Sequence, residues 1–187
     1  GIDNVELIQL DILEVSLLEE QFDIIECGGV LHHMNKPLEG LKVLLDLLEP
    51  HGFLKLGLYS EISRKHIVKI RKFIGNRNFN NTENDIRNCR EAILNQKDDN
   101  SLYKIIHNHD FYSTSGTRDL IFHVQEHRFT IPEITEILKN FNLEFLGFAN
   151  PFFKKKYLQL FPDDKKNLSL DNWNNFEINN PDAFKGM

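Results

Sequence analysis

The chain has few cysteines and no long hydrophobic run, and both features limit what it can be. Its two cysteines, Cys27 and Cys89, lie far apart and form neither a disulfide pattern nor a metal-binding pattern. No apolar segment approaches the roughly 20 residues that a membrane-spanning helix needs, and no secretory signal is present. Few cysteines are compatible with a reducing compartment, so we expect a cytoplasmic protein without a membrane segment.

An excess of positive charge is also missing, because the formal net charge is -6 over 187 residues. Domains that bind nucleic acid usually carry a basic face, so the composition does not favour such a partner, although it leaves room for a local basic patch. The length suggests one domain whose core needs no disulfide or metal. No methionine opens the chain, which begins at Gly1, and we expect a cut inside a longer protein.

The first third of the sequence predicts a βαβ unit. Residues 5–10 are short, apolar and typical of a strand, residues 22–27 predict a second strand, and Gly28 and Gly29 end that second segment. Leucines at helical spacing follow Pro37 and predict a helix that breaks at residues 49–52. Residues 53–59 predict a third strand. Short connections of this kind indicate parallel strands with a right-handed crossover.

The rest of the sequence predicts mainly helices. We expect helices over residues 62–74, 85–95, 102–106 and 130–140, a loop over residues 110–118, and a short strand or helical turn over residues 120–124. Residues 143–148 alternate between apolar and other side chains and predict a last strand. Beyond residue 151 the sequence is polar and rich in asparagine, so we expect an irregular tail.

Several motifs occur in the order found in class I S-adenosylmethionine-dependent methyltransferases. Residues 4–12 resemble the third strand of that family and the acidic residue after it. Residues 22–34, which include Val-Leu-His-His, resemble its fourth strand and the following turn. Residues 47–54 resemble the helix end that leads into strand five, with His51 in place of the usual first glycine. Residues 129–148 resemble the last helix and strand.

A narrower resemblance concerns a bacterial subgroup whose methyltransferase domain is often attached to tetratricopeptide repeats. It is carried by residues 57–60, 110–120, 123–129 and 173–187. The resemblance implies upstream tetratricopeptide-like repeats in the parent protein and a methyl acceptor that it does not identify.

The implied fold is α/β: an incomplete Rossmann-like class I methyltransferase sheet made of strands three, four, five and six or seven. Residues 1–150 would form the C-terminal portion of that domain, residues 60–118 a mainly helical insert on the substrate side, and residues 151–187 the tail. The family begins with a strand, a glycine-rich turn, a helix and a second strand that ends in an acid, and this sequence contains none of them. Strands one and two separate strands three and four in that family. We therefore expect a bare edge on residues 22–27, which upstream residues or a homodimer through the edge or tail would cover.

The resemblance also implies a cofactor, S-adenosyl-L-methionine, at the C-terminal ends of the parallel strands. Asp11 would bond the adenine amine and Ile12 would pack on the ring; the alternative for Asp11 is a turn residue after a strand. Cys27, Gly28 and Gly29 would meet the methionine half of the cofactor, because glycine lets a ligand approach the main chain closely. An ordinary turn explains these three residues equally well.

Four histidines are candidates for catalytic work. Histidine as a residue type suits general base work near neutrality, but for His32 and His33 packing and hydrogen bonding near the cofactor are the favoured roles. His123 and His127 belong to an H-x-x-E-H sequence, which on a helix would be an inverted zinc-protease signature. The stretch has no helical pattern, so lining the substrate side of the cleft is favoured over zinc binding, with a hydrogen-bonded loop as the structural alternative.

Two functions follow from this reading. The first is S-adenosylmethionine-dependent methyl transfer to a small-molecule or protein acceptor, with this chain alone expected to be inactive because it lacks the glycine loop. The alternative is a non-catalytic binding or interaction module built on a truncated methyltransferase fold. The basic helix near residues 64–72 could meet an anionic substrate or nucleic acid, although such runs are more often solvated helix faces.

Overall fold

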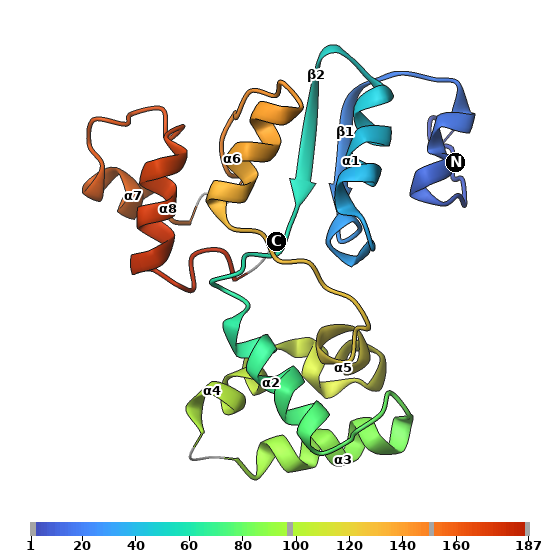
Figure 1. Ribbon diagram of the computed structural model, residues 1–187, viewed down its shortest axis with the longest axis vertical. Coiled ribbons are helices and arrows are strands. Elements are labelled where there is room, and N and C mark those ends of the chain that lie inside the picture. Colours follow the sequence, from blue (N-terminus) through green and yellow to red (C-terminus); the bar gives the residue numbers. More distant parts are fainter. Residues whose placement is uncertain (1–2, 97–98, 150–151, 186–187) are drawn as a thin grey trace. The chain divides into compact units, whose positions relative to one another are not determined.

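The computed structural model describes residues 3–96, 99–149 and 152–185. The chain divides into two compact units, and the elements of each are labelled in Figure 1. The first unit contains the N-terminal residues up to Leu58 together with Gln125–His127, and the second contains Tyr59–Val124 and residues 128–185. Within the described ranges, none of the helices has both the length and the apolar character needed to cross a membrane.

The first unit contains the predicted βαβ arrangement. Strand β1 (Phe22–Gly28) leads through a 3-10 turn to helix α1 (Pro37–Asp46), which leads to strand β2 (Leu48–Gly57). The two strands are parallel, and Cys27 and Gly28 lie opposite Leu56 and Gly57. The α/β class and the parallel pairing predicted from the sequence are therefore confirmed for these elements.

Strand β2 begins earlier than predicted. Residues 49–52, which were expected to separate the helix from the strand, belong to β2 and form an irregularity in its pairing with β1. Phe22 pairs with Leu48 while Ile24 pairs with Phe53, so extra residues are accommodated on β2. His51 takes a left-handed backbone conformation with φ 70°. A Cβ atom on Gly52 would lie 2.9 Å from the carbonyl oxygen of Asp23, so only glycine fits the close approach of the two strands.

The predicted strand over residues 5–10 is wrong, since this segment is outside any sheet in the part of the chain that the structure describes. Its apolar side chains are exposed, and Leu7 is 92% exposed. A strand is stabilised by hydrogen bonds and side-chain pairs with a neighbour, and β1 pairs with β2 alone among the described residues. The chain then forms the 3-10 helix η1 (Ile12–Leu18), which packs against α1.

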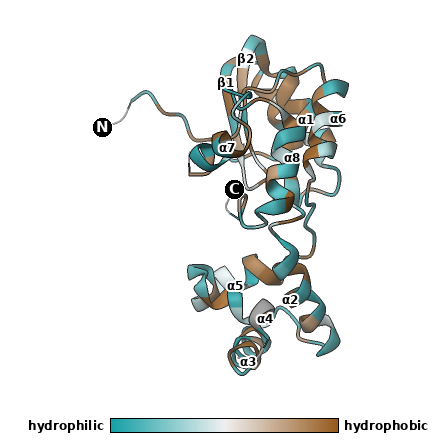
Figure 2. Cartoon of the chain, turned by 90° about the vertical axis from the view of Figure 1, so that its left-hand side faces the viewer, coloured by the Kyte–Doolittle hydropathy of each residue, from teal (hydrophilic) through white to brown (hydrophobic). Residues whose placement is uncertain are grey.

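The second unit begins with a group of helices around one hydrophobic core. They are α2 (Lys65–Asn76), α3 (Glu83–Leu94), α4 (Asn100–Tyr103), η3 (Lys104–His107), η4 (His109–Tyr112) and α5 (Thr114–Ile121). Their buried side chains include Ile70, Cys89, Ile93 and Phe111. Figure 2 shows that the helices carry both hydrophilic and hydrophobic residues, as helices with one buried face do.

The predicted loop over residues 110–118 is wrong, because η4 and most of α5 occupy it. The Ser113 side chain accepts a hydrogen bond from the Gly116 amide at 2.9 Å, which caps the start of α5. Phe111 and Thr117 are almost completely buried. A serine- and glycine-rich stretch thus becomes helical because it has a capping residue and because tertiary contacts bury Phe111 and Thr117.

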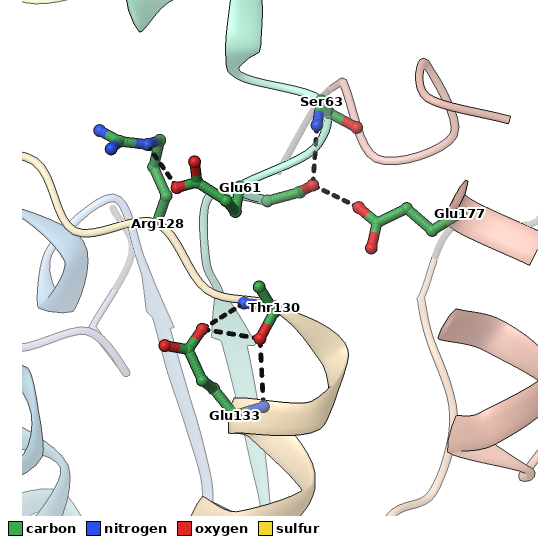
Figure 3. Close-up of polar contacts among 7 residues, drawn as sticks. Glu61, Ser63, Arg128, Thr130, Glu133 and Glu177 are labelled. Carbon is green, nitrogen blue, oxygen red and sulfur yellow. Dashed lines mark hydrogen bonds and ion pairs between the residues drawn. The ribbon is translucent and has the colours of Figure 1, made fainter. Parts of the chain in front are cut away.

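Helix α6 (Ile131–Asn140) begins as predicted. The Thr130 hydroxyl accepts from the Glu133 amide at 3.3 Å, and the Glu133 carboxylate accepts from the Thr130 amide at 2.7 Å (Figure 3). This reciprocal capping box satisfies two amide groups that a helix start leaves without intrahelical partners.

Two predictions for the C-terminal part are wrong. Residues 143–148 form no strand among the described residues, and the polar segment after residue 151 is not an irregular tail, because it contains α7 (Lys154–Leu160) and α8 (Leu170–Asn179). Aromatic packing explains both outcomes. Tyr157 stacks on Trp173 with ring centroids 3.9 Å apart, and Phe148 packs edge-on against Trp173 at 5.1 Å. Burial of these rings orders a sequence whose composition is otherwise polar.

Candidate functional site

The candidate site lies in the first unit, where the two parallel strands end side by side. Gly28, the last residue of β1, pairs with Gly57, the last residue of β2. A Cβ atom placed on Gly28 would meet no atom within 4 Å, so the backbone faces open space there. Gly29 then turns the chain with φ 76°, a conformation that favours glycine. This strand end can therefore admit a ligand against the main chain.

Cys27 precedes these glycines, and its side chain is only 7% exposed. Burial raises the pKa of the Cys27 thiol, which outweighs the opposing effect of a hydrogen bond with the Leu31 backbone. The side chain is therefore a neutral thiol at physiological pH, unsuited to act as a nucleophile or metal ligand. Cys27 can contribute to a ligand site through its main chain.

His32 holds the turn after β1 to the end of β2. It lies in the short 3-10 helix η2 (Leu31–His33), and its side chain is fully buried. Its Nδ1 atom lies 3.2 Å from the Gly57 carbonyl oxygen. A carbonyl can only accept, so Nδ1 must carry the proton in this contact. The His32 carbonyl in turn accepts from the His127 amide at 2.7 Å.

His33 and His127 meet at a small polar network beside η2. The Nδ1 atom of His33 lies 3.2 Å from the Gln125 carbonyl oxygen. The Gln125 side-chain amide donates to Asn35 at 3.1 Å and lies 3.4 Å from Nε2 of His127. Three of the four candidate histidines thus gather in one unit. The prediction from sequence missed Asn35 and Gln125, and no sequence pattern distinguishes Asn35 from an ordinary turn residue.

His123, the fourth candidate, belongs to the second unit. Its Nε2 atom lies 2.9 Å from the Asp119 carboxylate, and its carbonyl accepts a hydrogen bond from Arg71. Residues 123–127 are not helical, so the H-x-x-E-H sequence lacks the helical face that the zinc signature requires. Among the residues that the structure describes, no cluster of three or more His, Cys, Asp or Glu side chains could hold a metal ion.

Asp11 caps a helix and does not follow a strand. Its carboxylate accepts from the Leu13 amide at 2.9 Å at the start of η1, and the residue is exposed. Ile12, the first residue of η1, is partly buried. A capping carboxylate has further lone pairs, so Asp11 could still accept a bond from an adenine amine. The contacts with adenine predicted for Asp11 and Ile12 stay predictions.

A second polar cluster lies at the start of the second unit, outside the candidate site. The Ser60 hydroxyl donates to the buried Glu177 carboxylate on α8 and accepts from the Ser63 amide at 2.9 Å (Figure 3). Beside it, Arg128 Nε donates to Glu61 at 2.8 Å. Burial raises the pKa of the Glu177 carboxyl, against the opposing effects of Ser60 and Lys65. The prediction from sequence missed this cluster, because Ser60 and Glu177 are separated by 117 residues and Glu61 and Arg128 by 67.

Comparison with known proteins found similarity over the segment that contains Gly28 and most of both strands. Residues 1–56 match the model of a methyltransferase domain, a range that covers η1, β1, η2, α1 and nearly all of β2. These elements are therefore similar to part of a methyltransferase domain.

Two curated relatives share part of the chain. An uncharacterized protein of Synechococcus sp. is 39% identical over 72 residues, which are 38% of this chain and 17% of that protein. A tRNA U34 carboxymethyltransferase of Desulfotalea psychrophila is 36% identical over 56 residues, which are 30% of this chain and 18% of that enzyme. The matches thus span less than a fifth of the length of either relative.

Proposed function

We propose that this chain is part of an S-adenosylmethionine-dependent methyltransferase and supplies one half of its cofactor site. The observation that carries the proposal is the open backbone at Gly28, where two parallel strands end together. This strand end lies in the segment that matches a methyltransferase domain. Open α/β sheets bind their ligands outside the carboxyl ends of the strands. The acceptor would be a small molecule or a protein side chain.

The residues around Gly28 suit the modest demands of this chemistry. When bound, the cofactor would supply an activated methyl group on a sulfonium, so the protein has mainly to position the reactants, which can contribute roughly 7–11 kcal/mol. Gly28 and Gly29 would admit the methionine half of the cofactor. Buried His32 would position the turn, while His33 and His127 are the candidates to take a proton from an acceptor.

The alternative is a non-catalytic module that uses the same fold for binding. It is favoured by one feature of the sequence, which contains no G-x-G turn of the kind that holds this cofactor in the resembling family. The two functions differ in cofactor binding. A non-catalytic module would not bind S-adenosylmethionine, even in a form of the protein that extends upstream of Gly1.

Calorimetric titration of S-adenosylmethionine distinguishes these functions. A form of the chain that includes its natural upstream residues is expected to bind with measurable heat, and absence of heat would sink the proposal. Residues 1–187 alone should bind weakly, so a micromolar dissociation constant for them, about -8 kcal/mol, would contradict the assignment of half a site.

A substitution at Gly28 tests the place of the cofactor. Gly28→Leu fills the open space beside the strand end and should weaken cofactor binding at least about tenfold, or 1.4 kcal/mol. Its effect on unfolding should be small, because a Cβ atom there meets nothing within 4 Å. Gly75→Leu is the matched control, since Gly75 in α2 has equal space and lies outside the first unit. Equal affinities of the two variants would refute the placement.

A further inference from the structure

Positive charge is concentrated on one helix of this acidic protein. Residues 59–124 contain 11 Lys or Arg and 8 Asp or Glu, a net charge of +3, whereas the whole chain carries -6. Within them, residues 64–77 contain no acidic residue and six basic ones: Arg64, Lys65, Lys69, Arg71, Lys72 and Arg77. The net charge of the chain therefore hides a strongly basic helix, α2.

The three lysines among these residues form a single stripe on the exposed side of α2. Ile67, Ile70 and Ile74 are buried in the helical core of the second unit. Lys65, Lys69 and Lys72 are exposed, and their spacing of four and three residues places them on one face, opposite the isoleucines. At 1.5 Å per residue, successive lysines are separated by about 6 Å and 4.5 Å along the helix axis.

In the lysine stripe (Lys65, Lys69 and Lys72), Lys65 interacts electrostatically with the Glu177 carboxylate, whereas no carboxylate pairs with Lys69 or Lys72 within the part of the chain that the structure describes. None of the three amines forms an ion pair with a described carboxylate. Two other exposed lysines do form such pairs with a carboxylate three residues away: Lys36, at the N-cap of α1, with Glu39, and Lys139 on α6 with Glu136. Like charges at this spacing destabilise a helix. An anionic ligand bound to the stripe would remove this repulsion and stabilise α2.

The arginines of the run have structural contacts instead. Arg64 is buried, and its guanidinium carbon lies 3.7 Å from the centroid of the Tyr59 ring. Arg71 donates to the His123 carbonyl. The exposed charge of α2 therefore comes mainly from lysines. A lysine amine acts as a point charge toward phosphate and lacks the planar pair of donors with which an arginine recognises the edge of a specific base.

We infer that the lysine stripe binds the phosphate backbone of a nucleic acid strand without sequence preference. A membrane surface is disfavoured, because helices that lie on membranes insert their apolar face, and that face of α2 is buried in the protein core. This inference revises the expectation drawn from the net charge alone. Nucleic acid binding by the stripe does not depend on methyl transfer. The experiment that would disprove RNA binding therefore leaves the proposed methyltransferase function untouched, and the reverse is also true.

Fluorescence anisotropy of the full 187-residue chain with a fluorescein-labelled, mixed-sequence single-stranded RNA tests the inference. The RNA should be longer than the roughly 16 nucleotides of a large binding site. At low salt we expect a dissociation constant on the order of 1–100 μM, and the plot of log affinity against log salt should have a slope near about -2 for three contacts.

Three triple variants locate the surface. Lys→Gln at Lys65, Lys69 and Lys72 should lower the affinity at least about tenfold and flatten the salt dependence. Lys→Arg at the same positions preserves the charge and should retain binding. The matched control is Lys→Gln at residues 154–156, which removes the same charge from consecutive exposed positions of α7 that share no single stripe. This control should change the affinity by less than about twofold.

Three outcomes would overturn the inference. The first is absence of RNA binding by the unaltered chain at low salt. The second is an equal loss of affinity in the control, which would indicate an effect of total charge. The third is co-sedimentation with phosphatidylserine vesicles in place of RNA binding, which would assign the stripe to a membrane surface. Circular dichroism confirms that each variant keeps its helix content.

Discussion

Replacing His32 by leucine tests whether this histidine positions the turn after β1 or takes part in proton transfer. Leucine fills a similar volume in a fully buried position but cannot donate to the Gly57 carbonyl. Leaving a buried acceptor without its donor costs about 1–3 kcal/mol. We therefore expect the free energy of opening the two-stranded sheet to fall by about that amount.

Hydrogen exchange of the backbone amides in β1 and β2 measures this loss directly. Because 1.4 kcal/mol corresponds to a factor of ten, a loss of about 1–3 kcal/mol should accelerate exchange roughly 5- to 150-fold. His32→Asn should retain much of the protection, since its amide nitrogen can take the place of Nδ1. His33→Leu is the neighbouring control, and we expect a smaller effect because His33 is only partly buried.

One result would refute the positioning role. If His32→Leu left exchange in both strands unchanged but abolished methyl transfer by an upstream-extended form of the protein, His32 would act on the reaction itself. A parallel fall in protection and activity that asparagine rescues would support positioning, because asparagine cannot serve as a general base near neutrality.

Two further predictions concern the second unit. Phe176→Ala should cost about 3–5 kcal/mol in the free energy of unfolding because Phe176 is fully buried; the fluorescence of Trp173, the single tryptophan, reports it during urea unfolding. Phe152→Ala, at a position 86% exposed, should cost less than about 0.5 kcal/mol, and equal losses would contradict the packing. Burial raises the pKa of the Glu177 carboxyl, so the folded state holds this proton more tightly than the unfolded state and the contribution of Glu177 to stability is lost as pH rises through the folded pKa. Glu177→Gln, which can still accept from Ser60, should therefore gain stability relative to the unaltered chain as pH rises above the ordinary Glu pKa of about 4.3. Urea titrations at a series of pH values measure this difference, and a difference that does not change with pH would count against the raised pKa.

Local patterns predicted the elements that depend on neighbouring residues. Pro37 and the spaced leucines after it predicted α1, and the apolar segment ended by Gly28 predicted β1. Thr130 as a cap, followed by Pro132 and the acidic Glu133, predicted the start of α6. Hydrophobic period, caps and glycine breaks act over a few residues, so they can be identified without knowledge of the tertiary contacts.

Local patterns failed where a distant partner decides the outcome. Residues 5–10 have a strand sequence, but a strand needs a neighbour, and none of the described residues pairs with them. The stretch around Ser113 was predicted to be a loop and becomes helical because Phe111 and Thr117 are buried. The asparagine-rich tail becomes α7 and α8, because Tyr157 stacks on Trp173 across sixteen positions of sequence.

The candidate site divides in the same way. The sequence by itself determined the glycines at the end of β1, the two adjacent histidines and the resemblance to a methyltransferase domain, since these are contiguous motifs. Only the tertiary structure decided that His32 bonds the end of β2, that His127 joins it while His123 lies in the other unit, and that the lysines of α2 share one exposed face. These depend on contacts between segments far apart in the chain and on which helix face is buried, and neither is encoded in a local motif.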